Sequence, residues 1–87
     1  MARYRLGIKQ SAAREIEAIS HKRDRQRIVR RIRALAEDPR PPGCEKLAGR
    51  EGCCRVRQGQ YRVVYSVDDR SRMVEIVKVG HRREVYR

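Results

Sequence analysis

The chain opens with apolar and polar residues in alternation. Tyr4, Leu6 and Ile8 are apolar, and Arg or Lys stands at positions 3, 5 and 9. A period of two places successive side chains on opposite faces, which is typical of a β-strand with one buried face. The pattern therefore predicts a first strand over residues 3–9.

A short helix is predicted next. It carries apolar residues at positions i, i+4 and i+7, namely Ala12, Ile16 and Ile19. This spacing gives a helix one apolar face. Ser11 stands at the expected N-cap, and Glu15 lies near the positive end of the helix dipole.

A second helix is predicted to follow a break over residues 20–24 and to run as far as Glu37. Its apolar stripe comprises Ile28, Ile32, Leu35 and Ala36. The opposite face is nearly all Arg. Pro39 ends this helix, because the residue before a proline is pushed out of the helical region of backbone space.

The period returns to two in the second half of the chain. Residues 39–52 hold all three prolines and are predicted to form a loop. Beyond this loop, apolar residues alternate over 53–57, 61–67 and 73–79, with turns at Gln58-Gly59 and at Asp68 to Ser71. Three alternating segments joined by short turns predict a three-stranded antiparallel meander.

The resulting element order is β-α-α-β-β-β in a single domain over residues 1–87. We expect an α+β fold in which two helices pack on one face of an antiparallel sheet, because each helix has one apolar face to bury. The other face of the sheet then stays open. The alternation sends Arg55, Arg57 and Arg62 to that open face.

The net charge of the chain indicates which class of molecule it binds. The net charge is +12, and Arg accounts for nineteen of the 23 basic residues. So dense a positive charge favours a polyanion or an acidic protein as the partner, and nucleic acid leads. No apolar run is long enough to cross a membrane, and the N-terminus lacks the apolar core of a signal peptide, so a cytoplasmic protein without a membrane partner is expected.

The types of residue present also limit the reactions that the chain could catalyse. Cys44, Cys53 and Cys54 lack metal-ligand spacing and are expected to be thiols, so neither a metal nor another cofactor is predicted. No paired carboxylates or nucleophile motif is present. RNA cleavage needs neither, because the RNA 2′-hydroxyl attacks the adjacent phosphate while cations stabilise the developing charge. The tail offers three groups for proton transfer, and the choice among Tyr86, His81 and Arg82 stays open.

The order of motifs resembles one known family. The segment Gly59-Gln60-Tyr61-Arg62-Val63-Val64-Tyr65, followed by Val79-Gly80-His81-Arg82-Arg83-Glu84-Val85-Tyr86, is similar to the signature of the RelE/ParE toxin superfamily, and most similar to its RelE-type branch. The resemblance implies a RelE-like, microbial ribonuclease-type fold. It also implies the toxin of a type II toxin–antitoxin module, a metal-independent endoribonuclease that cleaves mRNA in the ribosomal A site.

The resemblance implies roles for four catalytic candidates. Arg62 matches the residue that grips the scissile phosphate, and Arg82 matches a tail residue assigned to the leaving group or to transition-state charge. Tyr86 matches the residue that stacks on or orients the substrate nucleotide. His81 stands where the best-known relatives have Lys, and it offers a conventional acid or base.

Three further arginines are substrate-binding candidates: Arg55, Arg57 and Arg83. The family often has Lys at the first two positions, and Arg keeps the charge but removes a group more easily tuned for proton transfer. The partners implied by the resemblance are the 30S A site with its mRNA and a cognate antitoxin. The antitoxin is expected to lay an acidic, partly disordered segment over the basic face.

Two other functions are compatible with the sequence. One is a ParE-type toxin that inhibits DNA gyrase without nuclease activity, a branch that shares the fold but generally lacks this Arg and Tyr set. The other is an inactive relic that binds RNA or its antitoxin. The presence of Arg62, Arg82 and Tyr86 favours the nuclease.

Overall fold

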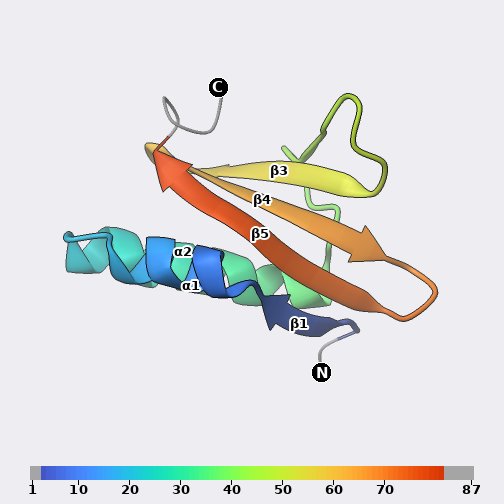
Figure 1. Ribbon diagram of the computed structural model, residues 1–87, viewed down its shortest axis with the longest axis horizontal. Coiled ribbons are helices and arrows are strands. Elements are labelled where there is room, and N and C mark those ends of the chain that lie inside the picture. The colour runs from blue at the N-terminus through green and yellow to red at the C-terminus, as the bar shows by residue number, and fades with distance from the viewer. Residues whose placement is uncertain (1–2, 82–87) are drawn as a thin grey trace.

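The computed structural model describes residues 3–81, which form two helices and five strands (Figure 1). In chain order these are β1 (Arg5–Ile8), α1 (Gln10–Glu17), α2 (Lys22–Glu37), β2 (Glu45–Lys46), β3 (Cys53–Gln58), β4 (Tyr61–Asp68) and β5 (Met73–His81). Neither helix of this described part is long and apolar enough to span a membrane.

The five strands form one sheet in the order β1-β5-β4-β3-β2. Strands β3, β4 and β5 pair antiparallel with their neighbours in sequence, so the predicted meander is confirmed. The expectation of a wholly antiparallel sheet is wrong, because β1 runs parallel to β5 with Arg5 opposite Met73 and Ile8 opposite Ile76. Alternation with period two is the same in both kinds of pairing and could not distinguish them. The short strand β2, inside the predicted loop, was also not expected.

Both helices lie on the same side of the sheet (Figure 1), as predicted. The expected stripe of α2 is buried in full. Ile28, Ile32 and Leu35 of this stripe pack in one core cluster with the inward side chains of the central strands, including Val56, Val63, Tyr65, Val74, Ile76 and Val79. One layer of helices and one layer of sheet thus share a single core.

The start of α1 differs from the prediction. The helix begins at Gln10, so Ser11 lies inside its first turn and Lys9 occupies the N-cap position. Among residues 3–81, no side chain caps this end through a hydrogen bond. The backbone comes directly from β1, where the Lys9 N–H still donates to the Ile76 carbonyl at 2.9 Å. Strand pairing, and not a serine cap, therefore determines where α1 begins.

Strand β5 contains one irregularity. Val64 lies opposite Lys78, but the next residue, Tyr65, lies opposite Ile76, so Val77 is an extra residue in the described register. Such a β-bulge shifts the alternation of the strand by one position. Beyond the bulge, Gly80 lies opposite Arg62 and His81 opposite Tyr61.

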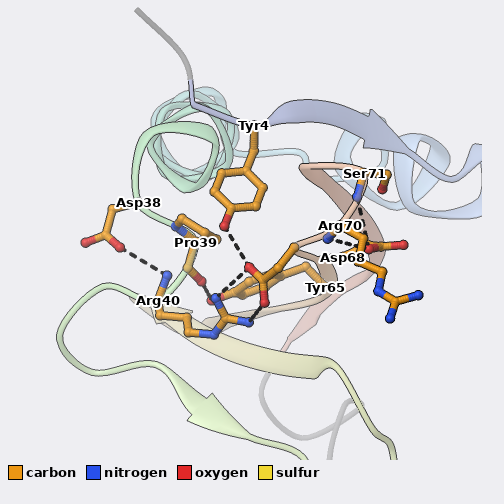
Figure 2. Close-up of polar contacts among 9 residues, drawn as sticks. Tyr4, Asp38, Pro39, Arg40, Tyr65, Asp68, Arg70 and Ser71 are labelled. Atoms are coloured by element: carbon orange, nitrogen blue, oxygen red, sulfur yellow. Dashed lines mark hydrogen bonds and ion pairs between the residues drawn. The ribbon is translucent and has the colours of Figure 1, made fainter.

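A polar network closes the end of the sheet where β4 turns into β5 (Figure 2). The Arg40 guanidinium donates to both oxygens of Asp69, at 3.2 and 3.0 Å, and the Tyr4 hydroxyl donates to Asp69 Oδ1 at 2.7 Å. We call Tyr4, Arg40 and Asp69 the hairpin cluster. It joins the segment before β1, the segment after α2 and the β4–β5 turn.

Beside the hairpin cluster, the fully buried Tyr65 hydroxyl donates to the Pro39 carbonyl at 2.7 Å (Figure 2). Burial is the main cause that raises the pKa of Tyr65 above its usual 10.0. Asp68 accepts hydrogen bonds from the backbone N–H groups of Arg70 and Ser71 at 3.0 and 3.2 Å, which confirms it as a turn residue. This end of the sheet is therefore fixed by hydrogen bonds from four segments of the chain.

Candidate active site

Three arginines lie on the sheet face that turns away from the helices, and we call Arg55, Arg57 and Arg62 the arginine face. Arg57 of β3 lies directly opposite Arg62 of β4, and Arg55 lies opposite Val64. Their neighbours Cys54, Val56 and Val63 belong to the core cluster on the other face. The alternation of the two strands thus places the three arginines together, as the sequence predicts.

The three arginines differ in exposure. Arg62 is only 4% exposed and Arg57 is exposed, while the Arg55 side chain is 15% exposed. Val64, on the same face, is also only 4% exposed. This part of the face is therefore less open than the sequence suggests. The Arg62 side chain therefore lies where water screens electrostatic interactions little.

Gly80 provides space next to Arg62. The two residues are opposite each other on β5 and β4, and Gly80 is itself buried. Opposite residues of an antiparallel pair point their side chains to the same face. Because glycine has none, the backbone of β5 lies next to the Arg62 side chain. Residue 80 is thus a neighbour of the candidate site through its backbone alone.

A carboxylate from β2 reaches the rim of the arginine face. Glu45 lies opposite Arg55, and its Oε2 is 3.2 Å from Arg55 Nη2. The Glu45 side chain is 63% exposed, so the ion pair contributes little to stability. Sequence analysis missed Glu45 because a strand of only two residues has no detectable period.

His81 lies on the other face of the sheet. It is opposite Tyr61, and the two rings meet edge to face with centroids 5.9 Å apart and an angle of 74°. Both rings line a cavity of about 280 Å³ at the end of α1, together with Ile19 and Ser20. The structure therefore does not bring His81 together with Arg62, although sequence analysis proposed both for one site.

The remaining candidates lie outside the described residues. These are Arg82, Arg83 and Tyr86. Their roles stay predictions from the sequence. The part of the expected site that the structure describes is the arginine face.

Sequence analysis missed the role of Glu15. It noted this residue only for its place on the helix dipole, but its carboxylate spans from α1 to β5. Glu15 Oε1 accepts from the Val79 N–H at 3.0 Å, and Oε2 accepts from Lys78 Nζ at 3.0 Å. No local pattern signals a contact between residues 63 and 64 positions apart.

The three cysteines are free thiols. Cys54 is buried on the core side of β3, and burial is the main cause that raises the pKa of its thiol. Cys44 and Cys53 are half-buried. Within residues 3–81, no three His, Cys, Asp or Glu side chains are grouped so that they could hold a metal ion.

Known proteins resemble this chain over nearly its whole length. Residues 6–86 match the family described as "ParE toxin of type II toxin-antitoxin system, parDE". Toxin RelE of Mycobacterium tuberculosis is 31% identical over 84 residues, which cover 97% of this chain and 87% of that protein.

Solved structures agree with this match. The archaeal RelE–RelB complex from Pyrococcus horikoshii OT3 has a chain that superposes with a TM-score of 0.81 at 27% identity, covering 92% of this chain and 96% of that one. The isolated E. coli RelE toxin superposes with a TM-score of 0.78 at 29% identity, covering 95% and 90%. Fold, sequence and family signature agree, and the chain belongs to the RelE/ParE family of toxins of type II toxin–antitoxin systems.

Proposed function

We propose that this toxin is a ribosome-dependent endoribonuclease that cleaves mRNA in the A site without a metal ion. The observation that carries the proposal is the pairing of Arg57 with the buried Arg62 on the face away from the helices. Two adjacent guanidiniums fit the non-bridging oxygens of one phosphate. The similarity to toxins named RelE supports the same conclusion.

The reaction needs only groups that this chain contains. The 2′-oxygen of the RNA attacks the adjacent phosphorus, and the bond from phosphorus to the 5′-oxygen breaks. The products are a 2′,3′-cyclic phosphate and a 5′-hydroxyl, so one proton leaves the 2′-hydroxyl and one reaches the 5′-oxygen. Arg62 and Arg57 hold the phosphate for in-line attack and stabilise the charge that grows on its oxygens. Arg55 and Arg83 are assigned to binding the flanking phosphates.

The proton transfers are assigned to the tail. Tyr86 and Arg82 are the candidates that follow the family signature. His81 fits less well, because it lies with Tyr61 on the opposite face from Arg62. The geometry therefore favours a tail residue other than His81 as the partner of the arginine face.

We assign a cognate antitoxin as the second partner. Two solved relatives are complexes of RelE with RelB, one from P. horikoshii and one from E. coli. The arginine face supports an acidic segment as the binding element, since such a segment would neutralise Arg55, Arg57 and Arg62. An antitoxin bound there would also cover the site that holds the RNA phosphate.

Gyrase inhibition is the competing function, because the matching family is described by its ParE toxin. The named relatives given above are RelE toxins, and Arg62, Arg82 and Tyr86 match the nuclease branch. We therefore place the nuclease first and use gyrase as the second arm of the test.

The test adds purified toxin to a reconstituted translation system and maps the new 5′ ends of the message. Wild type should cut at A-site codons only when ribosomes are present, and Arg62→Ala should reduce the cutting about 100-fold or more. Arg70→Ala removes the same charge from the exposed β4–β5 turn and should leave cutting unchanged. If wild type leaves the message intact while translation proceeds, the nuclease is excluded. A gyrase supercoiling assay then tests the alternative.

A further inference from the structure

The last part of β5 has a strand neighbour on one side only. Strand β1 ends at Ile8, which lies opposite Ile76, and the chain turns into α1 at Gln10. Residues 77–81 of β5 continue beyond this point, with β4 as their neighbour among the described strands. The bulge at Val77 falls at the start of the same stretch. A bulged strand with one open edge is prone to local opening.

Glu15 takes the place of the missing strand at this edge. Its Oε1 accepts from the Val79 N–H, as a carbonyl of a neighbouring strand would, and its Oε2 binds Lys78 Nζ, both at 3.0 Å. The Glu15 side chain is 31% exposed, so the contact is partly shielded from water. The carboxylate thus fastens α1 to the two residues that follow the bulge.

Glu15 contacts Lys78 and Val79, and the next residue of β5, Gly80, is the one opposite Arg62. The Val79 N–H points to α1, so the N–H of the next residue, Gly80, points toward β4. Gly80 lies opposite Arg62, whose side chain is buried. Movement of β5 at this point would therefore widen the space around Arg62 and change the direction of its side chain.

We propose that Glu15 is a positioning residue for the arginine face, acting through Val79 and Gly80 and not through contact with RNA. The proposal rests on the proposed nuclease function. It predicts that an acceptor oxygen on the side chain of residue 15 is needed for the rate of cleavage, although this side chain comes from α1, on the helix side of the sheet.

The hydrogen bond to the Val79 N–H is the contact that matters. Lys78 is 45% exposed, and an ion pair at such a site contributes little. A backbone N–H, by contrast, is fixed in direction and needs an acceptor. Glu15→Gln keeps an acceptor oxygen but loses the charge, while Lys78→Met keeps the bond to Val79 and removes the ion pair together with one positive charge. Glu15→Ala removes both contacts.

The experiment measures kcat and KM for cleavage of ribosome-bound message by the full-length protein and these three variants. Glu15→Ala should lower kcat about tenfold, because a small misplacement of a catalytic group is costly. Its KM should stay within about twofold of wild type, since the groups that bind substrate in the ground state are intact. Glu15→Gln and Lys78→Met should keep about half of the wild-type kcat or more.

Two controls separate positioning from general stability. Ile16→Val trims the buried face of the same helix and leaves Glu15 and its two contacts in place, and all variants are assayed at a temperature where each is folded. Its kcat should match wild type. Amide hydrogen exchange at Val79 and Gly80 should be faster in Glu15→Ala than in Ile16→Val.

Three results would overturn the proposal. One is an active wild type with an equally active Glu15→Ala variant. Another is a Glu15→Gln variant that falls as far as Glu15→Ala, which would make charge and not the acceptor the cause. The third is a wild type that does not cleave at all, and in that case the nuclease function itself fails.

Discussion

The two ends of β4 differ in the charge of the residue that faces an arginine. Just past its C-terminal end, Arg40 meets Asp69 through both guanidinium nitrogens, and Tyr4 donates to the same carboxylate. At its N-terminal end, Arg62 lies opposite another arginine, Arg57. One end places opposite charges together, and the other places like charges together. Arginine thus stabilises the fold at the C-terminal end of β4 and destabilises it at the N-terminal end.

The contrast supports the proposal that the N-terminal end of β4 binds an anionic ligand. Like charges directly opposite each other on neighbouring strands are destabilising, and burial of a guanidinium such as Arg62 adds a desolvation cost. A bound phosphate or carboxylate relieves both. Arrangements that cost stability in this way are expected at functional sites.

The largest effect should follow from removing the exposed member of the arginine pair. Arg57→Ala should reduce cleavage about 100-fold, because one of the two guanidiniums on the phosphate is lost. The thermal midpoint should not fall, since a like-charge neighbour of Arg62 has been removed. Initial cleavage rates and thermal unfolding of the same sample check both statements. A variant that unfolds earlier than wild type would contradict the view that this end opposes stability.

The next largest effect is expected on the stability of the protein, at the C-terminal end of β4. Tyr65→Phe removes the buried hydrogen bond to the Pro39 carbonyl and should lower the free energy of unfolding by about 1–3 kcal/mol. Cleavage should be unchanged, because Tyr65 points to the core side. Denaturant titration and the cleavage assay measure the two quantities. Tyr4→Phe, which loses a hydroxyl at an exposed site, is the matched control and should change stability less.

Alkaline pH should weaken the same end. The pKa of Tyr65 is raised mainly by burial, so the unfolded chain ionises this phenol at a lower pH than the folded protein does. Its contribution is complete below the usual pKa of 10.0 and is lost as the pH rises above it. The stability advantage of wild type over Tyr65→Phe should therefore shrink between about pH 9 and pH 11. If the difference in stability between wild type and Tyr65→Phe stays constant over this range, folding does not shield the Tyr65 hydroxyl from ionisation.

The smallest effect is expected at the hairpin cluster in acid. Hydrogen bonds from Arg40 and then Tyr4 lower the pKa of Asp69 below its usual 3.8. The carboxylate therefore stabilises the fold above that value, and the stabilisation is lost as the pH falls through the lowered pKa. Arg40→Ala should melt slightly below wild type at neutral pH, and this difference in melting temperature should narrow as the pH falls below 3.8. If the difference in melting temperature is the same at neutral and at acid pH, it is caused by the packing of Arg40 and not by its ion pair with Asp69.

Local periodicity was enough to predict much of the molecule. The stripe of α2 and the meander follow from spacing within a few residues, and so does the placement of Arg55, Arg57 and Arg62 on one face. These features depend on which side of an element each residue faces, which the period itself determines. The parallel pairing of β1 with β5 depends on residues far apart in the chain and could not be predicted in this way.

The bulge explains the largest difference at the site. In a regular strand, the alternation of Val74 and Ile76 would continue, and His81 would lie on the same face as Arg62. The extra residue Val77 shifts the alternation, so that Val79 enters the core and His81 meets Tyr61. No turn residue or glycine marks this position in the sequence. One inserted residue therefore decides on which side of the sheet the histidine lies.

The parallel pairing of β1 with β5 has a consequence for how the chain is made. Strand β5 lies between β1 and β4, although it is the last of the strands within residues 3–81 to leave the ribosome during synthesis. A nascent chain that ends at β4 has made its first strand but lacks the central strand on which that first strand pairs. Gly80, which lies beside Arg62, is also absent at that stage. The described sheet can close only after β5 has been made, so a growing chain that ends before β5 is expected to have an incomplete sheet.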